Sequence, residues 1–335
     1  SAEWPQTRLT HPVPKRRSYW RPMSDFPASL GAEVEAFLDS ITSPLAFMFR
    51  SPVTRNTAKQ YRSSITALAS ALVEIGTPVT DLTSLTVLVQ PDHVERALHF
   101  HFERHHQRVT SVMLQMTYHA KVISTHWVKA DPEQIATLKK LCNRLQHHRG
   151  RSRGLTDKNR HLLSHFDEPH RRDQLLLLPE TLLKEAQLSR HVDWDASLAR
   201  CALMIELLLT CALRRENMVT LRLDESIKRL GTGNNARWVI QVTAEKVKNR
   251  EPLQFELGAE TIRILEAYLK DWRPKLCSTP TDWLFPTPRG EAMDLRHAGE
   301  DIAKKAHRYL GVRITPHQFR HLSADLYLEE NPDGL

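Results

Sequence analysis

The run LARCALMIELLLTCAL, from Leu198 to Leu213, is the most apolar stretch of the chain. It is shorter than the roughly 20 apolar residues that a membrane-spanning helix needs, and Glu206 lies near its middle. These features are typical of a helix buried in the core of a globular domain. The run therefore predicts a domain built around one central helix, and it gives no indication of a membrane partner.

The composition fits a folded protein that acts on a polyanion. The 335 residues suffice for two domains, and the hydrophobic share of 41% is ordinary for a globular chain. A formal net charge of +8 is typical of nucleic-acid-binding proteins, although good solubility alone would also account for it. The four cysteines form no CxxC pair, which argues against structural zinc or disulfides and favours a reduced, intracellular compartment. No Gly-rich phosphate loop is visible, so we expect no nucleotide or other cofactor.

Changes in composition divide the chain into four segments. Residues 1–28 are rich in proline and basic residues, which predicts an extended arm, either a solvated leader or a clamp on a phosphate backbone or a partner subunit. Residues 29–145 show helical periodicity and predict a compact all-α domain. Residues 146–178 mix Gly, His and Arg without sustained periodicity, so we interpret them as a basic linker. Residues 179–335 predict a mostly helical α+β domain.

Two polar clusters lie before the second domain. One comprises four histidines with an i, i+4 pair, but no carboxylate or cysteine completes a metal-ligand set, so a polar helix face is favoured. These are His99, His101, His105 and His106. The other comprises Arg149, Arg151 and Arg153 in the linker. These arginines are candidate contacts to a nucleic-acid backbone, where neutralised phosphates release counterions; the alternative is a flexible tether.

Two strands and a turn follow the apolar helix. Residues 238–242 and 253–257 alternate between apolar and polar side chains, as in half-buried strands, and EKVKNRE joins them as a turn. This turn contains Lys248, whose ammonium group can reach a ligand or face water. A further helix is predicted over 259–272.

The segment TPHQFRH, Thr315 to His321, specifies the start of another helix. Thr315 and Gln318 have the spacing of a capping box, and a proline occupies the first helical position. His317 and Arg320 then share the first turns, where free N–H groups and the helix dipole favour an anion such as phosphate. A second basic site follows the apolar helix, which delivers Arg214 and Arg215 in CALRREN.

In this order, and after an all-α domain, these segments resemble the tyrosine recombinase (phage integrase) family, whose motifs run like TGLRxSE and HxLRH. The resemblance covers most of the chain. It assigns catalytic roles to Arg214, Lys248, His317 and Arg320, although Lys246 competes with Lys248 for the lysine role. Two further departures from the motifs, an asparagine at position 217 and a phenylalanine at position 319, remove no charged group.

The resemblance also implies an architecture and partners. The helix over 56–72 looks like the opening helix of the family's core-binding domain, a SAM-like helical bundle, and makes Lys59 and Arg62 candidate DNA contacts. That domain and the α+β catalytic domain, with its small antiparallel sheet, would form a C-shaped clamp round duplex DNA. Implied partners are a double-stranded recombination site and further copies of the chain, as a dimer to tetramer. The implied location is cytoplasmic and nucleoid-associated, as for a mobile genetic element.

The implied chemistry is phosphoryl transfer without metal or ATP, in which a tyrosine attacks a phosphodiester and forms a 3'-phosphotyrosyl link. The guanidinium groups of Arg214 and Arg320 would stabilise charge on the attacked phosphate. His317 would donate a hydrogen bond or handle a proton, and Lys248 would protonate the leaving 5'-oxygen.

The family's nucleophile lies several helical turns beyond the HxxR motif, and we expect it to be absent from this chain, which ends at Leu335. Tyr327 lies seven residues after Arg320, about 10 Å along one helix, and we expect it to pack in the core. Truncation is the favoured explanation. The alternative is a noncatalytic DNA-binding regulator with a recombinase-derived fold.

Overall fold

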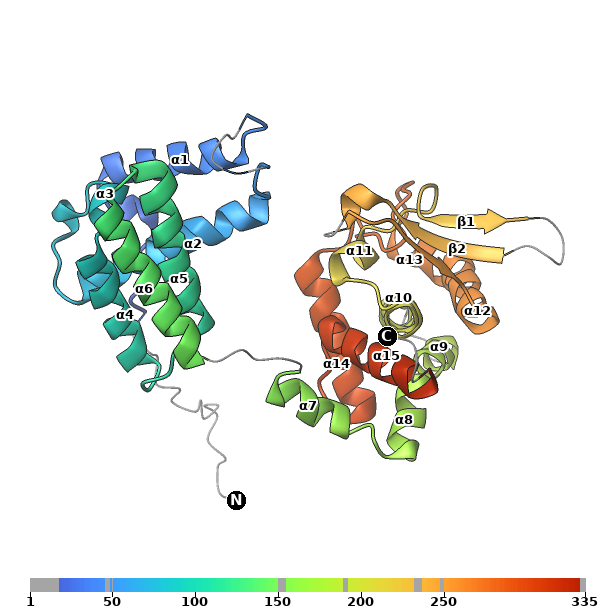
Figure 1. The fold of residues 1–335 in the computed structure, drawn as a ribbon. Helices are drawn as coiled ribbons and strands as arrows, with labels where there is room; N and C mark the ends of the chain where they lie inside the picture. Colours follow the sequence, from blue (N-terminus) through green and yellow to red (C-terminus); the bar gives the residue numbers. More distant parts are fainter. Residues whose placement is uncertain are drawn as a thin grey trace, which may run out of the picture. The chain divides into compact units, whose positions relative to one another are not determined.

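The computed structural model describes residues 18–45, 49, 51–149, 155–188, 192–231, 237–247 and 250–331. The chain divides into two compact units, residues Ser1–Arg153 and Gly154–Leu335. Each unit encloses a hydrophobic core of its own. Figure 1 shows that helices make up almost all of the first unit, whereas the second combines helices with a small sheet.

The first unit is an all-α bundle, as the sequence predicted. Its elements are η1 (Met23–Asp25), α1 (Ala28–Thr42), α2 (Arg55–Glu74), η2 (Val79–Asp81), α3 (Leu85–Leu88), α4 (Pro91–Arg104), α5 (Ser111–Ile123), η3 (Ser124–Val128) and α6 (Pro132–Arg149). On α2, Tyr61, Ile65, Leu68 and Leu72 are buried at spacings of three and four, which is the stripe that an amphipathic helix turns toward a core. The helices α1, α4 and α5 pack against α2, so it forms the centre of the unit.

Part of the expected arm over residues 1–28 packs on the first unit instead. Phe26 is buried in the first core, and the ring of Tyr19 packs edge-on against Phe100 with ring centroids 5.2 Å apart. These aromatic side chains supply the apolar area that holds this part of the segment on the bundle. Residues 1–17 lie outside the described residues.

The second unit is the predicted mostly helical α+β domain. Its elements are α7 (Asp157–Ser164), α8 (Pro169–Leu176), α9 (Leu178–Leu188), α10 (Val192–Thr210), α11 (Arg215–Val219), β1 (Ile227–Leu230), β2 (Arg237–Val242), η5 (Ala244–Lys246), β3 (Leu253–Glu256), α12 (Ala259–Ala267), η6 (Tyr268–Trp272), α13 (Arg273–Leu276), α14 (Leu295–Leu310) and α15 (Pro316–Glu330). The described strands form one antiparallel sheet in the order β1-β2-β3, with Ile240 opposite both Ile227 and Phe255.

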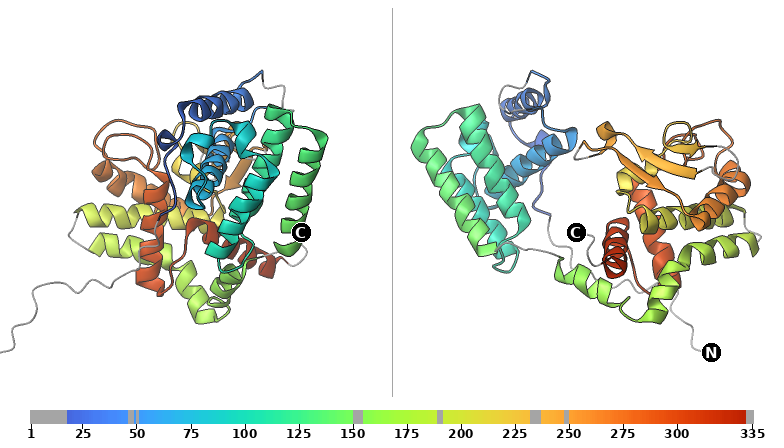
Figure 2. Two further views of the ribbon diagram at one scale, coloured as in Figure 1. Left: turned by 90° about the vertical axis from the view of Figure 1, so that its left-hand side faces the viewer. Right: turned by 45° about the vertical axis from the view of Figure 1, so that its right-hand side comes forward.

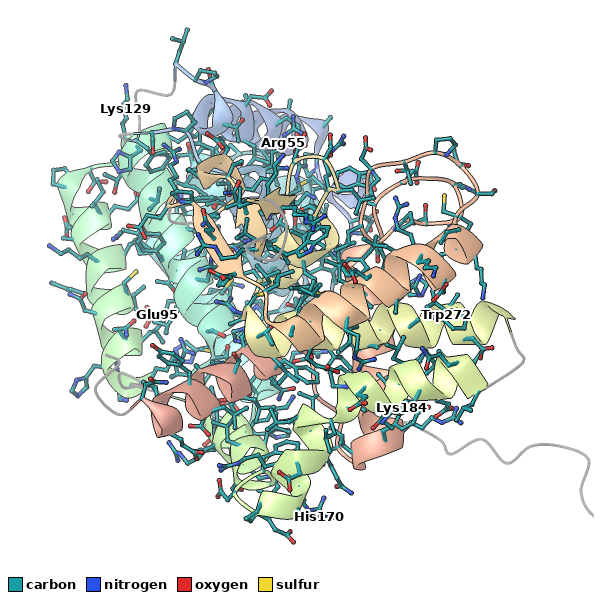
Figure 3. The ribbon with its side chains drawn as sticks, turned by 90° about the vertical axis from the view of Figure 1, so that its right-hand side faces the viewer. Arg55, Glu95, Lys129, His170, Lys184 and Trp272 are labelled. Carbon is teal, nitrogen blue, oxygen red and sulfur yellow. The ribbon has the colours of Figure 1, made fainter. Side chains whose placement is uncertain are left out.

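Helix α10 is the buried centre of this unit, which confirms the expectation from its apolar sequence. It packs against α9, α12, α13, α14 and α15, and Figures 1 and 2 show it enclosed by these helices. Residues Leu203 to Ile205 are fully buried. The π turn η6, which follows α12, ends at the buried Trp272. Lys184 on α9 lies at the surface and forms an ion pair with Glu180 (Figure 3).

The predicted linker over residues 146–178 is largely helical instead. Helix α6 continues to Arg149, and α7 and α8 occupy much of the remainder. Leu162, Phe166 and Leu175 are buried in the core of the second unit, so residues 155–178 belong to that unit, whereas the end of α6 belongs to the first. Each of the two helices spans only 8 residues, about two turns, which is too short for a helical period to stand out in the sequence.

Candidate active site

Helix α15 begins at the capped turn that the sequence predicted. The side-chain oxygen of Gln318 accepts hydrogen bonds from the backbone N–H of Thr315 at 3.0 Å and from its hydroxyl group at 2.9 Å. The amide nitrogen of Gln318 donates to Asn159 on α7 at 3.3 Å, which ties the turn to the rest of the unit. His317 is exposed and Arg320 is partly buried. The first turns of α15 therefore present cationic and polar groups where free N–H groups already favour an anion.

A strained turn positions Arg214 after the central helix. Helix α10 ends at Thr210, and Ala212 then adopts a left-handed backbone conformation with φ of 44°. This conformation is unfavourable for a residue with a Cβ atom, so surrounding packing must hold it. The side chain of Leu213 is 1% exposed and anchors the turn in the core. Arg214, partly buried, follows as the N-cap of α11.

Arg214 and Arg320 lie near enough for the charge of Arg214 to act on Arg320. Burial lowers the pKa of Arg320, and the positive charge of Arg214 lowers it further. The Nε atom of Arg320 is buried and has no hydrogen-bond partner among the described residues. Two neighbouring guanidinium groups repel each other, and an anion between them would relieve this repulsion and use their free donors.

A second histidine joins the predicted one. The Nε2 atoms of His317 and His321 are 3.2 Å apart, and their ring centroids are 4.6 Å apart. Burial lowers the pKa of His321, and the neighbouring His317 and Arg320 lower it further. Sequence reasoning assigned no role to His321; the only signal for this contact was the i, i+4 spacing within TPHQFRH.

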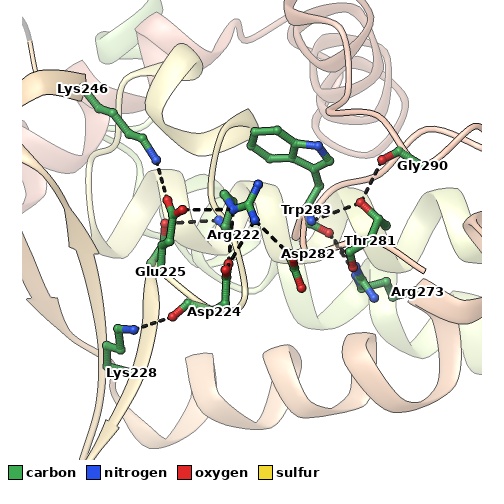
Figure 4. Close-up of polar contacts among 11 residues, drawn as sticks. Arg222, Asp224, Glu225, Lys228, Lys246, Arg273, Thr281, Asp282, Trp283 and Gly290 are labelled. Atoms are coloured by element: carbon green, nitrogen blue, oxygen red, sulfur yellow. Dashed lines mark hydrogen bonds and ion pairs between the residues drawn. The ribbon is translucent and has the colours of Figure 1, made fainter. Parts of the chain in front are cut away.

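The turn between β2 and β3 carries both candidate lysines. Lys246 forms an ion pair with Glu225 at 3.0 Å, and Glu225 also contacts Arg222 at 3.4 Å (Figure 4). The N–H of Arg250 donates to the backbone oxygen of Val247 at 2.9 Å, which closes the turn. Lys248 lies outside the described residues. The ammonium group of Lys246 is therefore engaged by a carboxylate at the edge of the domain.

The predicted DNA-contacting residues in the first unit differ in whether a carboxylate already binds their charged group. Lys59 is exposed on α2, and Arg149 is exposed at the end of α6. Arg62 instead forms a two-pronged ion pair with Glu35 of α1, which offsets its charge locally. Arg151 and Arg153 lie outside the described residues.

Tyr327 does not pack in the core, contrary to expectation. It is 56% exposed on the last part of α15. Phe319 and Leu322 belong to the buried face of this helix, and a residue five positions after Leu322 points well away from that face. Exposure makes Tyr327 chemically accessible, but its place seven residues after Arg320 keeps its Cα about 10 Å farther along the helix axis.

Three further observations concern Asn217, metal ligands and membrane-spanning helices. Asn217, which departs from the family motif, is 4% exposed, and its Nδ2 atom has no hydrogen-bond partner among the described residues. Within the described ranges, no group of three or more His, Cys, Asp or Glu side chains is arranged to hold a metal ion. Of the helices that the structure describes, none has the length and apolarity that a membrane crossing requires.

Comparison with known proteins identifies the second unit. Residues 180–333 match the model of the phage integrase family. The chain is 32% identical over 142 residues to tyrosine recombinase XerC of Anoxybacillus flavithermus, and 33% identical over 133 residues to tyrosine recombinase XerD of Pseudomonas putida. Each match covers 39% of this chain and 41% of the relative, so the matched stretch spans about two fifths of these curated proteins.

Solved structures with a similar course of the chain include the lambda integrase (residues 75–356) bound to DNA and the XerA recombinase. The first is 14% identical with a TM-score of 0.48, over 89% of this chain and 88% of that chain. The second is 17% identical with a TM-score of 0.33, over 90% of this chain and 86% of that chain.

Proposed function

Residues 180–333 belong to the phage integrase family of tyrosine recombinases, and from this premise we propose that the protein is a site-specific DNA recombinase that breaks and rejoins strands through a 3'-phosphotyrosyl intermediate. The observation that carries the proposal is that Arg214 lies close enough to Arg320 for its charge to lower the pKa of Arg320, and that Arg320 shares the first turns of α15 with His317. Such a cluster of donors suits a phosphodiester, whose nonbridging oxygens gain negative charge during attack.

In the proposed reaction, the nucleophile forms a bond to phosphorus while the bond from phosphorus to the 5'-oxygen breaks. Arg214 and Arg320 donate hydrogen bonds to the nonbridging oxygens, and their planar forks keep the phosphate oriented. His317 donates a further hydrogen bond. The leaving 5'-oxygen takes its proton from Lys248, so it departs as a neutral hydroxyl group. A 5'-hydroxyl group from another strand reverses these steps.

The proposed ligand is duplex DNA contacted by both units. Exposed cations in the first unit, Lys59 and Arg149, supply backbone contacts, whereas the paired Arg62 contributes less. Recombinase structures similar in fold include a lambda integrase dimer on a core site and a tetramer on a Holliday junction. We propose that this chain likewise assembles on its DNA as a dimer or tetramer. Binding should weaken steeply with salt, because each neutralised phosphate releases counterions.

We propose that none of the three tyrosines of the second unit is the nucleophile. Tyr268 is fully buried, and the hydroxyl group of Tyr309 is bound to Glu185. Tyr327 is accessible but is rigidly separated from Arg320 by two turns of the same helix. None of these three can bring its oxygen to a phosphate held by Arg320 while the fold stays intact.

An external nucleophile tests the proposal on this chain. Duplexes bound by the full chain are first recovered from a random-sequence pool, and strand cleavage is then measured with hydrogen peroxide and a chelator present. We expect cleavage at one phosphodiester with release of a 5'-hydroxyl end. Arg214→Ala and Arg320→Ala should lower its rate at least about 100-fold, the scale of losing an electrostatic donor, while affinity changes little.

Two arginines provide matched controls. Arg215 follows Arg214 but packs beside Gly299 of α14, and Arg313 pairs with the exposed Glu300. Alanine at either position should leave site-specific cleavage within a few-fold of the wild-type rate. Sequence-specific binding with no cleavage in any of these proteins would instead favour the noncatalytic DNA-binding regulator. One observation supports that alternative: the buried Nδ2 atom of Asn217, in the arginine motif, has no hydrogen-bond partner among the described residues.

A further inference from the structure

The contact between His317 and His321 restricts which hydrogen atoms these side chains carry. Their Nε2 atoms are 3.2 Å apart, which is hydrogen-bond distance. In a neutral imidazole one nitrogen carries hydrogen and the other accepts. When both rings are neutral, a hydrogen bond between the two Nε2 atoms therefore requires one of them to be protonated and the other to be bare.

The surroundings of His321 favour its neutral form. Burial lowers the pKa of His321, and Arg320, the preceding residue on α15, lowers it further. The acidic residues that follow on α15 are Asp325, one turn after His321, and Glu329, which is paired with Arg172. A positive charge on His321 would be added next to the guanidinium group of Arg320.

The two arrangements of hydrogen differ in what they offer an anion. If His321 donates from Nε2, the Nε2 of His317 accepts, and His317 must carry its hydrogen on Nδ1. That Nδ1–H group is then a free donor at the start of α15. In the reverse arrangement, His317 would present a bare Nδ1 lone pair, which repels a phosphate oxygen.

We propose that His321 is a positioning residue that holds His317 in the Nδ1–H form, so that His317 donates from Nδ1 to an anion bound by Arg214 and Arg320. This inference rests on the proposed function, because it takes the bound anion to be the phosphate of a DNA strand. An isolated neutral histidine in water prefers hydrogen on Nε2. The contact with His321 thus selects the form of His317 that is the minor one in water.

Nuclear magnetic resonance of the full chain labelled with ¹⁵N in histidine tests this, because long-range proton–nitrogen correlations distinguish the two forms. The ring signals are assigned from His317→Gln and His321→Gln, and sulfate is the probe, since its charge is constant near neutral pH. We expect His317 with hydrogen on Nδ1 and His321 with hydrogen on Nε2, more completely when sulfate is bound. In His321→Leu, His317 should return to the Nε2–H form, and sulfate should bind about two- to tenfold more weakly, the scale of one neutral hydrogen bond.

The rescue variant is His321→Gln, whose amide can donate to the Nε2 of His317 and should preserve the Nδ1–H form. A His317 that carries hydrogen on Nε2 in the sulfate-bound wild type would overturn the proposal, even if His321→Leu did not fold. So would an unchanged His317 in a folded His321→Leu. Failure of sulfate to affect any ring signal of His317 or His321 would instead count against the anion site, and hence against the proposed function itself.

Discussion

Ser323 of α15 donates a hydrogen bond from its hydroxyl group to the backbone oxygen of Leu209, 2.6 Å away in the last turn of α10. This contact fixes α15 directly beside the turn that leads to Arg214. Since α15 carries Arg320, one hydrogen bond joins the supports of both arginines. The two segments are 114 residues apart in the sequence, so their proximity depends on the packing of the whole second unit.

Removing the hydroxyl group of Ser323 should make the first turns of α15 more mobile while lowering the unfolding free energy only slightly. Ser323→Ala leaves the oxygen of Leu209 without this donor, and we expect a loss of about 1 kcal/mol in unfolding free energy. Faster hydrogen exchange should appear at the amides of the first turns of α15. Ser164→Ala is the control, because its exposed hydroxyl group donates only to His161 within α7. Equal exchange at α15 in both variants would contradict the linking role.

A buried ion network should dominate the acid sensitivity of the second unit. Asp301 accepts from Lys305 at 2.7 Å and from Arg200 at 3.1 Å. Burial raises the pKa of Asp301, but the two cations outweigh burial, so its pKa lies below the usual value. Asp301→Asn leaves two buried cations without their carboxylate and should cost about 3–5 kcal/mol at neutral pH.

The sign of the pH dependence follows from the lowered pKa. The ionised Asp301 stabilises the folded state fully above its unfolded pKa of about 3.9, and this contribution is lost as pH falls through the lower folded value. The stability gap between the wild type and Asp301→Asn should therefore narrow below about pH 4 in calorimetry. Glu300→Gln on the same helix removes only an exposed ion pair with Arg313, so its unfolding free energy should differ little from that of the wild type at any pH. A gap for Asp301→Asn that stays constant in acid would contradict this account.

Ionisation of Glu206 should destabilise the folded state, whereas ionisation of Asp301 stabilises it. It is 7% exposed in the middle of α10, burial raises its pKa, and the hydroxyl group of Thr261 donates to it at 2.6 Å. A raised folded pKa means that ionisation opposes folding, so the penalty is absent below the ordinary value of about 4.3 and grows as pH rises through the folded value. Glu206→Gln keeps the acceptor for Thr261 and should be more stable than the wild type at pH 8 but not at pH 4.

Thermal unfolding across this pH range checks the prediction for Glu206. The control is Glu260→Gln, because hydrogen bonding to Arg263 lowers the pKa of Glu260 and its removal should not stabilise the protein at high pH. If Glu206→Gln were less stable than the wild type at pH 8, the carboxylate would be contributing an interaction that the neutral amide cannot replace.

Local signals explain what could be predicted from the sequence. The apolar run around Glu206 and the Thr315–Gln318 cap depend on neighbours within one or two turns, so α10 and the start of α15 were predicted correctly. Side-chain orientation late in a helix depends on which face is already buried. Phe319 and Leu322 set that face, and Tyr327 falls off it, which is why its predicted burial was wrong. The ring contact of His317 with His321 required coordinates, since i, i+4 spacing alone does not fix rotamers.

A duplex with a better leaving group should show which of the two candidate lysines is the general acid. Lys248→Ala should slow the peroxide cleavage of a normal duplex about 100-fold or more, because the 5'-oxygen then departs without a general acid. A duplex with sulfur in place of the bridging 5'-oxygen should restore the rate, since a thiolate leaves without a proton. Lys246→Ala should stay within a few-fold of wild type on both duplexes, because Lys246 is paired with Glu225 at 3.0 Å. A slow Lys246→Ala that the sulfur duplex rescues, with Lys248→Ala unaffected, would move the general acid to Lys246 and require its pair with Glu225 to open during the reaction.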